Sequence, residues 1–222
     1  MTAFRVDVRR FIHDNVTDTC AVWNVLSSRT LYAAARAASC RFVITGYVAY
    51  ECLRKRSQQD EGDRQILERF RISRKEGLWP IHSLKVEDLF DYEMLERRKR
   101  LGKGELSSMV LAKKIGAAVL TDDQKGRRLA ESYLGGVERV QTTPHLFGWL
   151  VFDGRLVDSD KDVVVHEHSQ LGRPLAPYFE TIFMKALEMR LAVQYGMSSG
   201  TLDEGSQEAK RGRAESFEGE MA

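Results

Sequence analysis

Residues 101–130 read LGKGELSSMVLAKKIGAAVLTDDQKGRRLA. Apolar residues first repeat at helical spacing, a Gly-Ala pair then interrupts the repeat, and the apolar run 118–120 follows. We therefore expect a helix that leads into a short buried strand, with Glu105 at the start of the helix and Asp122 and Asp123 just after the strand. Carboxylates directly beyond the carboxyl end of a strand lie where open α/β sheets bind ligands.

The overall composition fits a globular protein with a substantial core. The chain has 222 residues, of which 43% are hydrophobic, enough for one domain with appended segments. Its 34 Lys and Arg against 32 Asp and Glu leave a net charge of +2, which excludes a global field that attracts nucleic acid or membrane. Any nucleic-acid affinity must therefore come from local patches. The three cysteines, Cys20, Cys40 and Cys52, lack metal-ligand spacing and are expected to be reduced core residues.

The sequence shows no targeting or membrane segment. The opening MTAFRVDVRRFIHD lacks the apolar run of a signal peptide, and nowhere do about 18 uncharged apolar residues occur together. We expect a cytoplasmic protein without membrane contact. Residues 196–222 are poor in large apolar groups, which predicts a disordered tail.

Strand and helix patterns alternate through the rest of the chain. A strand that begins near Phe11 ends at about Asp18, which precedes an alanine-rich helical segment, and RFVIT at 41–45 is a second, β-branched strand. Glu51 falls in the early turns of the helix that follows this strand. Two charged helices flank a short strand at 78–82. This alternation predicts an α/β fold with a parallel sheet covered by helices on both faces.

Acidic residues follow several of the predicted strands. They are Asp18, Glu51, Glu105 and the pair Asp122 and Asp123. Carboxylates that converge raise one another's pKa values unless a cation neutralises them. All-oxygen ligands favour Mg²⁺ or Mn²⁺, and such ions bind phosphates and activate water. Each acid alone also fits a helix cap or a turn, and Asp14 is an alternative to Asp18 as the acid of the first strand.

Four fragments of the chain, taken in their order, carry a resemblance to a known family. They are VTDTCAVWNVL at 16–26, VITGYVAYECL at 43–53, LGKGELSSMVLA at 101–112 and VLTDDQKGRRLA at 119–130. Together they resemble the PIN-domain family, the nuclease fold of many bacterial toxin ribonucleases, over roughly residues 11–150. The resemblance implies a three-layer α/β/α sandwich and a metal-dependent endoribonuclease whose clustered acids hold Mg²⁺ or Mn²⁺. For a member that acts as a toxin, it also implies a partner antitoxin that blocks the acidic pocket.

The resemblance also implies a role for each acid. Asp18 matches the aspartate after the first strand, Glu51 the acid in the helix after the second strand, and Glu105 the acid that opens the central helix. The Thr-x-Asp pattern selects Asp123 over Asp122 as the fourth catalytic acid, while Asp122 stays an additional candidate metal ligand.

RNA needs positive charge to approach clustered carboxylates. Thr19, Lys103 and Arg127 lie close in sequence to the acids and are the candidate nucleic-acid-binding residues. Thr19 matches a hydroxyl residue that often follows the first aspartate of the family. The basic runs 54–56 and 97–100 are either further RNA contacts or solvated helix faces.

The C-terminal part of the chain extends beyond the family resemblance. We expect a nuclease domain at 1–155, a helical extension at 156–195 and the tail at 196–222. Residues 174–193 predict an amphipathic helix, which either packs on its own domain or forms a partner or homodimer surface.

The sequence leaves one alternative function open, and it disfavours a zinc site. His166 and His168 follow three valines and would share one side of a strand, but no further His or Cys lies nearby, so zinc binding is not expected. The alternative to a nuclease is a non-catalytic module of the same fold that binds RNA or a protein.

Overall fold

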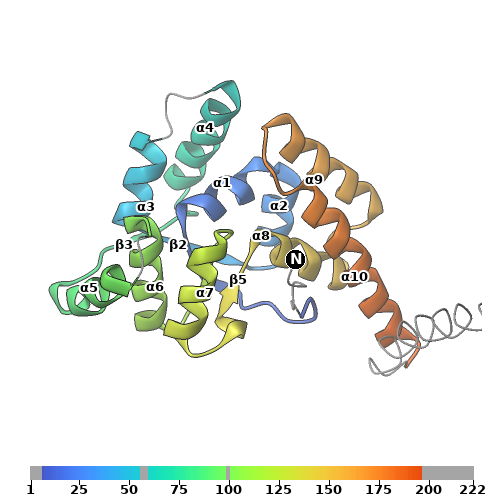
Figure 1. Ribbon diagram of the computed structural model, residues 1–222. Coiled ribbons are helices and arrows are strands. Elements are labelled where there is room, and N and C mark those ends of the chain that lie inside the picture. Colours follow the sequence, from blue (N-terminus) through green and yellow to red (C-terminus); the bar gives the residue numbers. More distant parts are fainter. Residues whose placement is uncertain (1–6, 56–59, 99–100, 197–222) are drawn as a thin grey trace, which may run out of the picture.

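The computed structural model describes residues 7–55, 60–98 and 101–196, and the predicted tail after residue 196 lies outside these ranges. Strands and helices alternate along most of the described chain (Figure 1). The elements in chain order are β1 (Asp14–Thr17), α1 (Thr19–Ser27), α2 (Arg29–Ala37), β2 (Arg41–Thr45), α3 (Gly46–Tyr50), a π-helical turn η1 (Glu51–Lys55), α4 (Glu61–Lys75), β3 (Ile81–His82), η2 (Val86–Asp88), α5 (Leu89–Arg98), α6 (Lys103–Ile115), β4 (Ala118–Leu120), α7 (Gln124–Leu134), η3 (Val137–Arg139), β5 (Val140–Gln141), α8 (Thr143–Phe152), α9 (Asp158–Gln170) and α10 (Ala176–Gln194).

The strands of the described residues form one parallel sheet in the order β3-β2-β1-β4-β5. The chain builds outward from β1 to β3 on one side and then returns to add β4 and β5 on the other side. The direction of winding therefore reverses between β1 and β4, where Thr17 stands opposite Leu120. Open α/β sheets bind ligands at the carboxyl ends of the strands at such a switch point.

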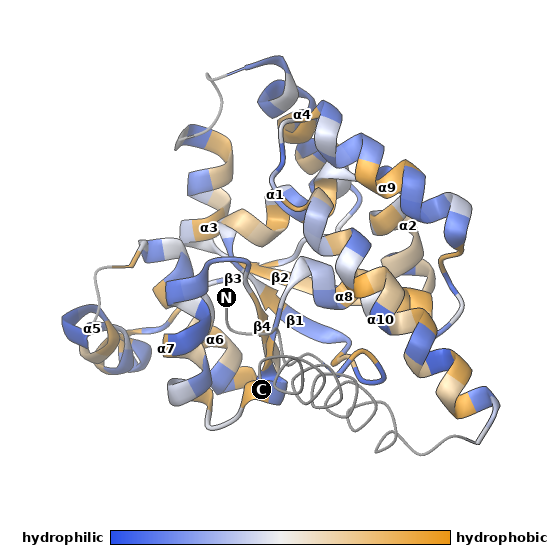
Figure 2. Ribbon diagram, turned by 45° about the vertical axis from the view of Figure 1, so that its right-hand side comes forward, coloured by the Kyte–Doolittle hydropathy of each residue, from blue (hydrophilic) through white to orange (hydrophobic). Residues whose placement is uncertain are grey.

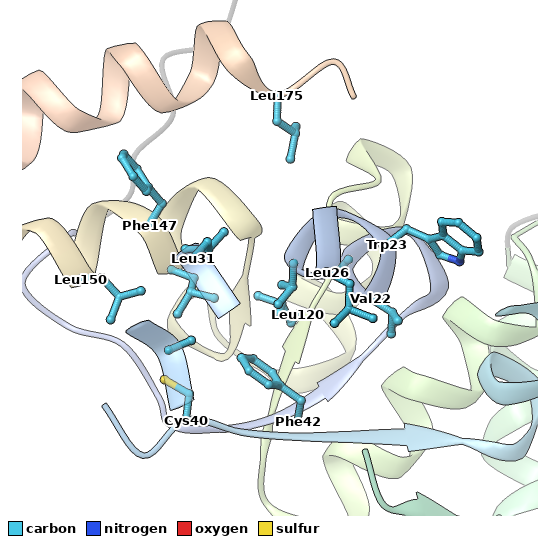
Figure 3. Packing of buried hydrophobic residues seen from close by; sticks show 14 of the residues in the cluster. Val22, Trp23, Leu26, Leu31, Cys40, Phe42, Leu120, Phe147, Leu150 and Leu175 are labelled. Atoms are coloured by element: carbon cyan, nitrogen blue, oxygen red, sulfur yellow. The ribbon is translucent and has the colours of Figure 1, made fainter. Parts of the chain in front are cut away.

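Helices cover both faces of this sheet. Side chains of a strand alternate between faces, so Phe42 and Ile44 of β2 enter one core cluster while Val43 packs against the other. The first cluster joins the sheet to α1, α2, α4, α8, α9 and α10, and Figure 3 shows part of it around Phe42 and Leu120. The second joins the sheet to α5, α6 and α7. The predicted three-layer α/β/α arrangement is confirmed.

The helix α6 and strand β4 have the predicted order. Gly116 ends α6 with a left-handed φ of 71°, a conformation that glycine adopts at little cost. The amide of Ala117 then donates to the carbonyl of Ala112, which closes the helix before β4 starts at Ala118. The Gly-Ala pair therefore separates helix from strand as predicted.

The predicted amphipathic C-terminal helix is α10, and it packs back on the same chain. Phe179, Ile182 and Phe183 are buried in the core cluster that also holds Phe147 of α8. Figure 2 shows hydrophobic residues along α8 and α10, and Figure 3 shows Phe147 and Leu175 at this packing. The limits of the nuclease domain and of the extension stay a prediction.

The strand expected around the two histidines is wrong, because this segment is helical. His166 and His168 lie in α9, where residues two apart point to different sides. Accordingly, His168 is buried and His166 is exposed. The three valines suggested a strand, yet Val164 alone of them is fully buried, which matches helical spacing against the core.

His168 makes the folded protein sensitive to acid. Its ring packs edge-on against Phe179 at 4.7 Å between centroids, and neither ring nitrogen has a hydrogen-bond partner among the described residues. Burial, together with the charges of Arg173 and Arg69, lowers the pKa of His168 to about 3. The neutral ring is therefore the form that the folded state accommodates.

We predict that His168→Leu reduces the loss of stability in acid. Because the pKa is lower in the folded than in the unfolded chain, the unfolded state binds more protons, and stability falls as pH drops below about 6.5. The penalty amounts to roughly 2 kcal/mol at pH 5. Urea unfolding gives the free energy of unfolding of the wild type and of the variant at pH 7 and at pH 5. The wild type should lose more of this free energy than the variant between the two pH values. A difference that does not change with pH would contradict a buried neutral His168.

Candidate active site

The candidate site lies at the carboxyl ends of β1 and β4. Asp18 follows β1 directly, and its amide donates to the carbonyl of Leu120 at 3.1 Å. Thr121 continues from β4, and Asp122 and Asp123 follow it. The two central strands of the sheet therefore deliver their acids to the same edge, at the switch point of the fold.

Asp18 is almost completely buried, with 1% of its surface exposed. One carboxylate oxygen accepts from the amide of Ala21 at 2.7 Å, which caps α1, and the other accepts from the Thr121 hydroxyl at 2.5 Å. Burial raises the pKa of Asp18 to about 7, these two hydrogen bonds oppose the shift, and the charges of Asp122 and Glu105 add to it.

Glu51 reaches the site from the second strand. It is the first residue of the π-helical turn after α3, and its carboxylate accepts from the Thr19 hydroxyl at 2.6 Å. A Cβ placed on Gly104 would lie 2.5 Å from Glu51 Oε2. Only glycine at residue 104 therefore leaves room for this carboxylate beside the start of α6.

Glu105 lies in the first turn of α6. Its carboxylate accepts from the amide of Gly102 at 2.7 Å. The Cβ position of Gly102 is 3.5 Å from Glu105 Oε2 and 3.9 Å from Glu51 Oε1, so both carboxylates lie within 4 Å of one point. Burial raises the pKa of Glu105, and the negative charges of Asp123 and Glu51 raise it further.

Asp122 and Asp123 are held in different ways. Asp122 accepts from Asn24 Nδ2, from the Thr143 amide and from the Thr143 hydroxyl, at 2.6–2.8 Å, so it joins α1 to α8. Asp123 caps α7 by accepting from the amide of Gly126 at 2.6 Å, and its own amide donates to the Thr121 hydroxyl. Asp122 therefore has three structural donors, whereas Asp123 is the acid whose charge acts on Glu105.

Asp14 lies at the other end of β1. It starts the strand, and its carboxylate forms a bidentate ion pair with Arg41 on the neighbouring β2 at 2.5 and 2.6 Å. The structure thus separates Asp14 from the other acids and leaves Asp18 as the acid at the carboxyl end of the first strand.

The capping roles expected for the single acids are present, yet they do not explain the cluster. Asp18, Glu105 and Asp123 each accept from an amide at a helix start. Serine or asparagine at residue 18 would cap α1 without the buried charge that raises the pKa of Asp18. Carboxylates that shift one another's pKa values at a sheet switch point are typical of functional sites.

The donor set suits a hard divalent cation, although the side chains do not form a ready metal site. Among the described residues, no three His, Cys, Asp or Glu side chains are arranged to hold an ion. Instead, amides and the hydroxyls of Thr19 and Thr121 satisfy the carboxylates. Oxygen ligands with raised pKa values match Mg²⁺ or Mn²⁺ chemically, since a cation would relieve their mutual repulsion.

The predicted nucleic-acid contacts differ in position. Lys103 is exposed at the start of α6, with Nζ 6.0 Å from the centroid of the Tyr47 ring. Arg127 is half-buried in α7; burial raises the pKa of Asp122, and the positive charge of Arg127 opposes this shift. Thr19 donates to Glu51 and therefore orients an acid. Of the basic runs, residues 56, 99 and 100 lie outside the described ranges.

Several residues that build the site were not predicted. Thr121 joins Asp18 to the amide of Asp123, and Gly104 makes space for Glu51. Asn24 and Thr143 hold Asp122. The TDD and GKGE motifs contained a signal for Thr121 and Gly104, whereas Asn24 and Thr143 meet Asp122 only after the helices pack.

No helix within the described residues is long and apolar enough to cross a membrane.

Comparison with known proteins gives one family. Searches of curated proteins and of solved structures found no match. A family model described as a PIN domain matches residues 15–135, more than half of the chain, and this segment contains all five acids of the candidate site. The chain therefore belongs to the PIN-domain family.

Proposed function

We propose that this protein is a Mg²⁺- or Mn²⁺-dependent endoribonuclease that hydrolyses phosphodiester bonds of single-stranded RNA. PIN domains are generally nucleases that use divalent metal ions, so membership of the family supports this class of reaction. The catalytic acids in this proposal are Asp18, Glu51, Glu105 and Asp123.

One observation supports the proposal most strongly. Acids from separate segments of the chain act on one another: burial raises the pKa values of Asp18 and Glu105, the charge of Glu105 adds to the shift of Asp18, and the charges of Asp123 and Glu51 add to that of Glu105. Buried carboxylates with raised pKa values destabilise a fold when they are charged. Their presence is understandable when a cation neutralises them in the working protein.

The chain's residues have distinct parts in this proposal. Asp18, Glu51, Glu105 and Asp123 hold the ion or ions, and Thr19 and Thr121 orient the carboxylates of Glu51 and Asp18. When bound, a divalent ion supplies positive charge to the phosphate and lowers the pKa of water. The amino-terminal ends of α1, α6 and α7 each carry one of these acids, and the partial positive charge of a helix start favours an anionic phosphate. Lys103 and Arg127 add positive charge at the edges.

A toxin role, with an antitoxin as partner, is a further prediction from the family resemblance. A homodimer and a cytoplasmic location stay predictions from the sequence. Asp122 is assigned a positioning part, since its oxygens already accept from Asn24 and Thr143.

A cleavage assay tests the proposed function. Labelled single-stranded RNA is incubated with the purified full-length protein in Mn²⁺, in Mg²⁺ and in EDTA, and with the variant Glu105→Gln. The glutamine carbonyl can still accept from the Gly102 amide, so α6 keeps its start. We expect cleavage only with metal, and a loss of at least about 100-fold in the variant, because even outer-shell partners of metal ligands contribute 10- to 100-fold. Cleavage in EDTA, or equal cleavage by the variant, would contradict the proposal, and RNA binding without cleavage in any metal would support the non-catalytic module.

A further inference from the structure

A groove of about 920 Å³ opens beside the acid cluster, between α3 and α5. Figure 1 shows α3, β3, α5 and α6 gathered on the same side of the molecule. The lining includes Tyr47, Tyr50, Glu51, Tyr92, Gly102 and Lys103. Glu51 is itself one of the clustered acids, and the amide of Gly102 donates to Glu105. The groove therefore continues directly from the candidate active site.

Three tyrosine side chains line this groove. Tyr47 and Tyr92 stack with ring centroids 6.0 Å apart and an angle of 22° between the planes. Tyr47 is 42% exposed and Tyr50 is 60% exposed, although both belong to a short helix next to the sheet. Exposed tyrosine rings beside a charged site offer flat apolar surfaces on which an unpaired base can stack.

A buried hydroxyl in the groove lacks a partner. Tyr92 is only 7% exposed, and its hydroxyl has no hydrogen-bond partner among the described residues. Buried polar groups are normally satisfied, so an unsatisfied one that lines a groove points to a ligand. Burial and the neighbouring Glu96, Tyr47 and Glu51 raise the pKa of Tyr92 to about 12, so the hydroxyl keeps its proton and can donate it to a ligand oxygen or nitrogen.

The charges of the groove favour a base inside it and a phosphate at its mouth. Glu51 and Glu96 line it, and their carboxylates repel a buried phosphate. Lys103 lies where the groove meets the acid cluster, with its ammonium 6.0 Å from the Tyr47 ring centroid. A nucleotide whose base enters the groove therefore places its phosphate beside Lys103 and next to the acids.

We propose that this groove binds one unpaired nucleobase of the RNA substrate, with the base stacked on Tyr47 and hydrogen-bonded by the Tyr92 hydroxyl. The inference rests on the proposed nuclease function and adds a subsite that selects single-stranded over double-stranded RNA. In a duplex the bases are stacked and paired, so they cannot enter the groove.

RNA binding without cleavage tests this subsite. Fluorescence anisotropy measures the affinity of the full-length protein for a short single-stranded RNA and for the matching duplex in EDTA, in both the wild type and the Glu105→Gln background. We expect Tyr47→Ala to weaken single-strand binding roughly 5- to 100-fold, the typical effect of losing one stacking platform, and to leave duplex binding unchanged. Tyr47→Phe keeps the ring and should restore most of the affinity.

Two further variants separate stacking from folding. Tyr92→Phe removes only the unpartnered hydroxyl, so it should weaken single-strand binding severalfold without lowering the melting temperature. Tyr178→Ala, at a tyrosine on α10 that is 49% exposed, is the control for loss of a surface ring and should not change binding.

The outcomes keep the subsite and the nuclease distinct. Equal single-strand affinity of Tyr47→Ala and Tyr178→Ala would overturn the subsite, and that is the result expected if the groove holds a protein segment. Equal weakening of single-strand and duplex binding would also overturn it. Loss of single-strand affinity in Tyr47→Ala, combined with no cleavage in any metal, would support the subsite while refuting the nuclease.

Discussion

Asp18→Asn should abolish RNA cleavage while making the metal-free protein more stable. The asparagine oxygen can still accept from the Ala21 amide, and its NH₂ group can donate to the Thr121 hydroxyl, so both contacts of residue 18 persist. Loss of the charge removes a ligand, and we expect cleavage to fall at least about 100-fold. An inactive variant that is also better folded cannot be explained by damage to the fold.

The stability change has a defined pH dependence. The pKa of Asp18 is about 7 in the folded protein against an ordinary value of 3.8, so the folded state binds more protons between these values. Stability of the wild type therefore falls as pH rises through this window, by up to about 1.4 kcal/mol per pH unit, and the variant lacks this loss. Thermal unfolding in EDTA at pH 5 and pH 8 measures this effect. The melting temperature of the variant should exceed that of the wild type by more at pH 8 than at pH 5.

Asp14→Asn is the matched control, since Asp14 lies on the same strand at the opposite end. Its ion pair with Arg41 is on the surface, where such pairs contribute at most about 1 kcal/mol. We expect normal cleavage by Asp14→Asn. Loss of cleavage in this variant, with retention in Asp18→Asn, would place the active site at the amino-terminal end of β1 and would contradict the proposed site.

Gly104→Ala should impair catalysis with little effect on folding. The added Cβ would approach Glu51 Oε2 to 2.5 Å and Thr19 Oγ1 to 3.0 Å, so the Glu51 carboxylate must move. The displaced atoms are at the end of a flexible side chain, and alanine is a better helix former than glycine, so the fold should tolerate the change. A displacement of about 1 Å at a reacting site can cost on the order of 100-fold in rate. Initial cleavage rates at saturating Mn²⁺, with a parallel melting curve, measure the effect.

Gly102→Ala provides a graded comparison at the start of the same helix. Its nearest neighbour would be Glu105 Oε2 at 3.5 Å, an ordinary van der Waals distance. Its cleavage rate should therefore stay within about threefold of the wild type. Equal losses in the two variants would show that this helix start tolerates no side chain, rather than that Glu51 needs the space at residue 104.

The architecture and the positions of the candidate acids could be predicted from the sequence because they depend on local patterns. The helix-glycine-strand order around Gly116 fixed where β4 begins, and a parallel strand brings its carboxyl end to a common edge. Asp18, Glu51, Glu105 and the pair after β4 consequently lie on that edge. The choice between Asp14 and Asp18 required the register, in which Thr17 stands opposite Leu120.

Other features depend on packing between distant segments and left little trace in the sequence. The donors that hold Asp122 and the stacking of Tyr47 on Tyr92 join residues that are far apart in the chain. The π-helical turn that carries Glu51 departs from the regular helical spacing that a sequence pattern predicts. His166 and His168 followed a valine run typical of a strand, yet tertiary packing of Val164 and His168 favours the helix. Local propensity was overruled there by burial.

A crystal soaked in Mn²⁺ and measured at the manganese absorption edge tests the central claim most directly. We expect an anomalous peak bounded by the carboxylates of Asp18, Glu105 and Asp123, with Glu51 contacting the ion directly or through water, and metal–oxygen distances of about 2.0–2.4 Å. The Thr19 and Thr121 hydroxyls should keep contact with the carboxylates that they orient. Manganese bound elsewhere, or no bound manganese in crystals of a protein that cleaves RNA, would contradict the account.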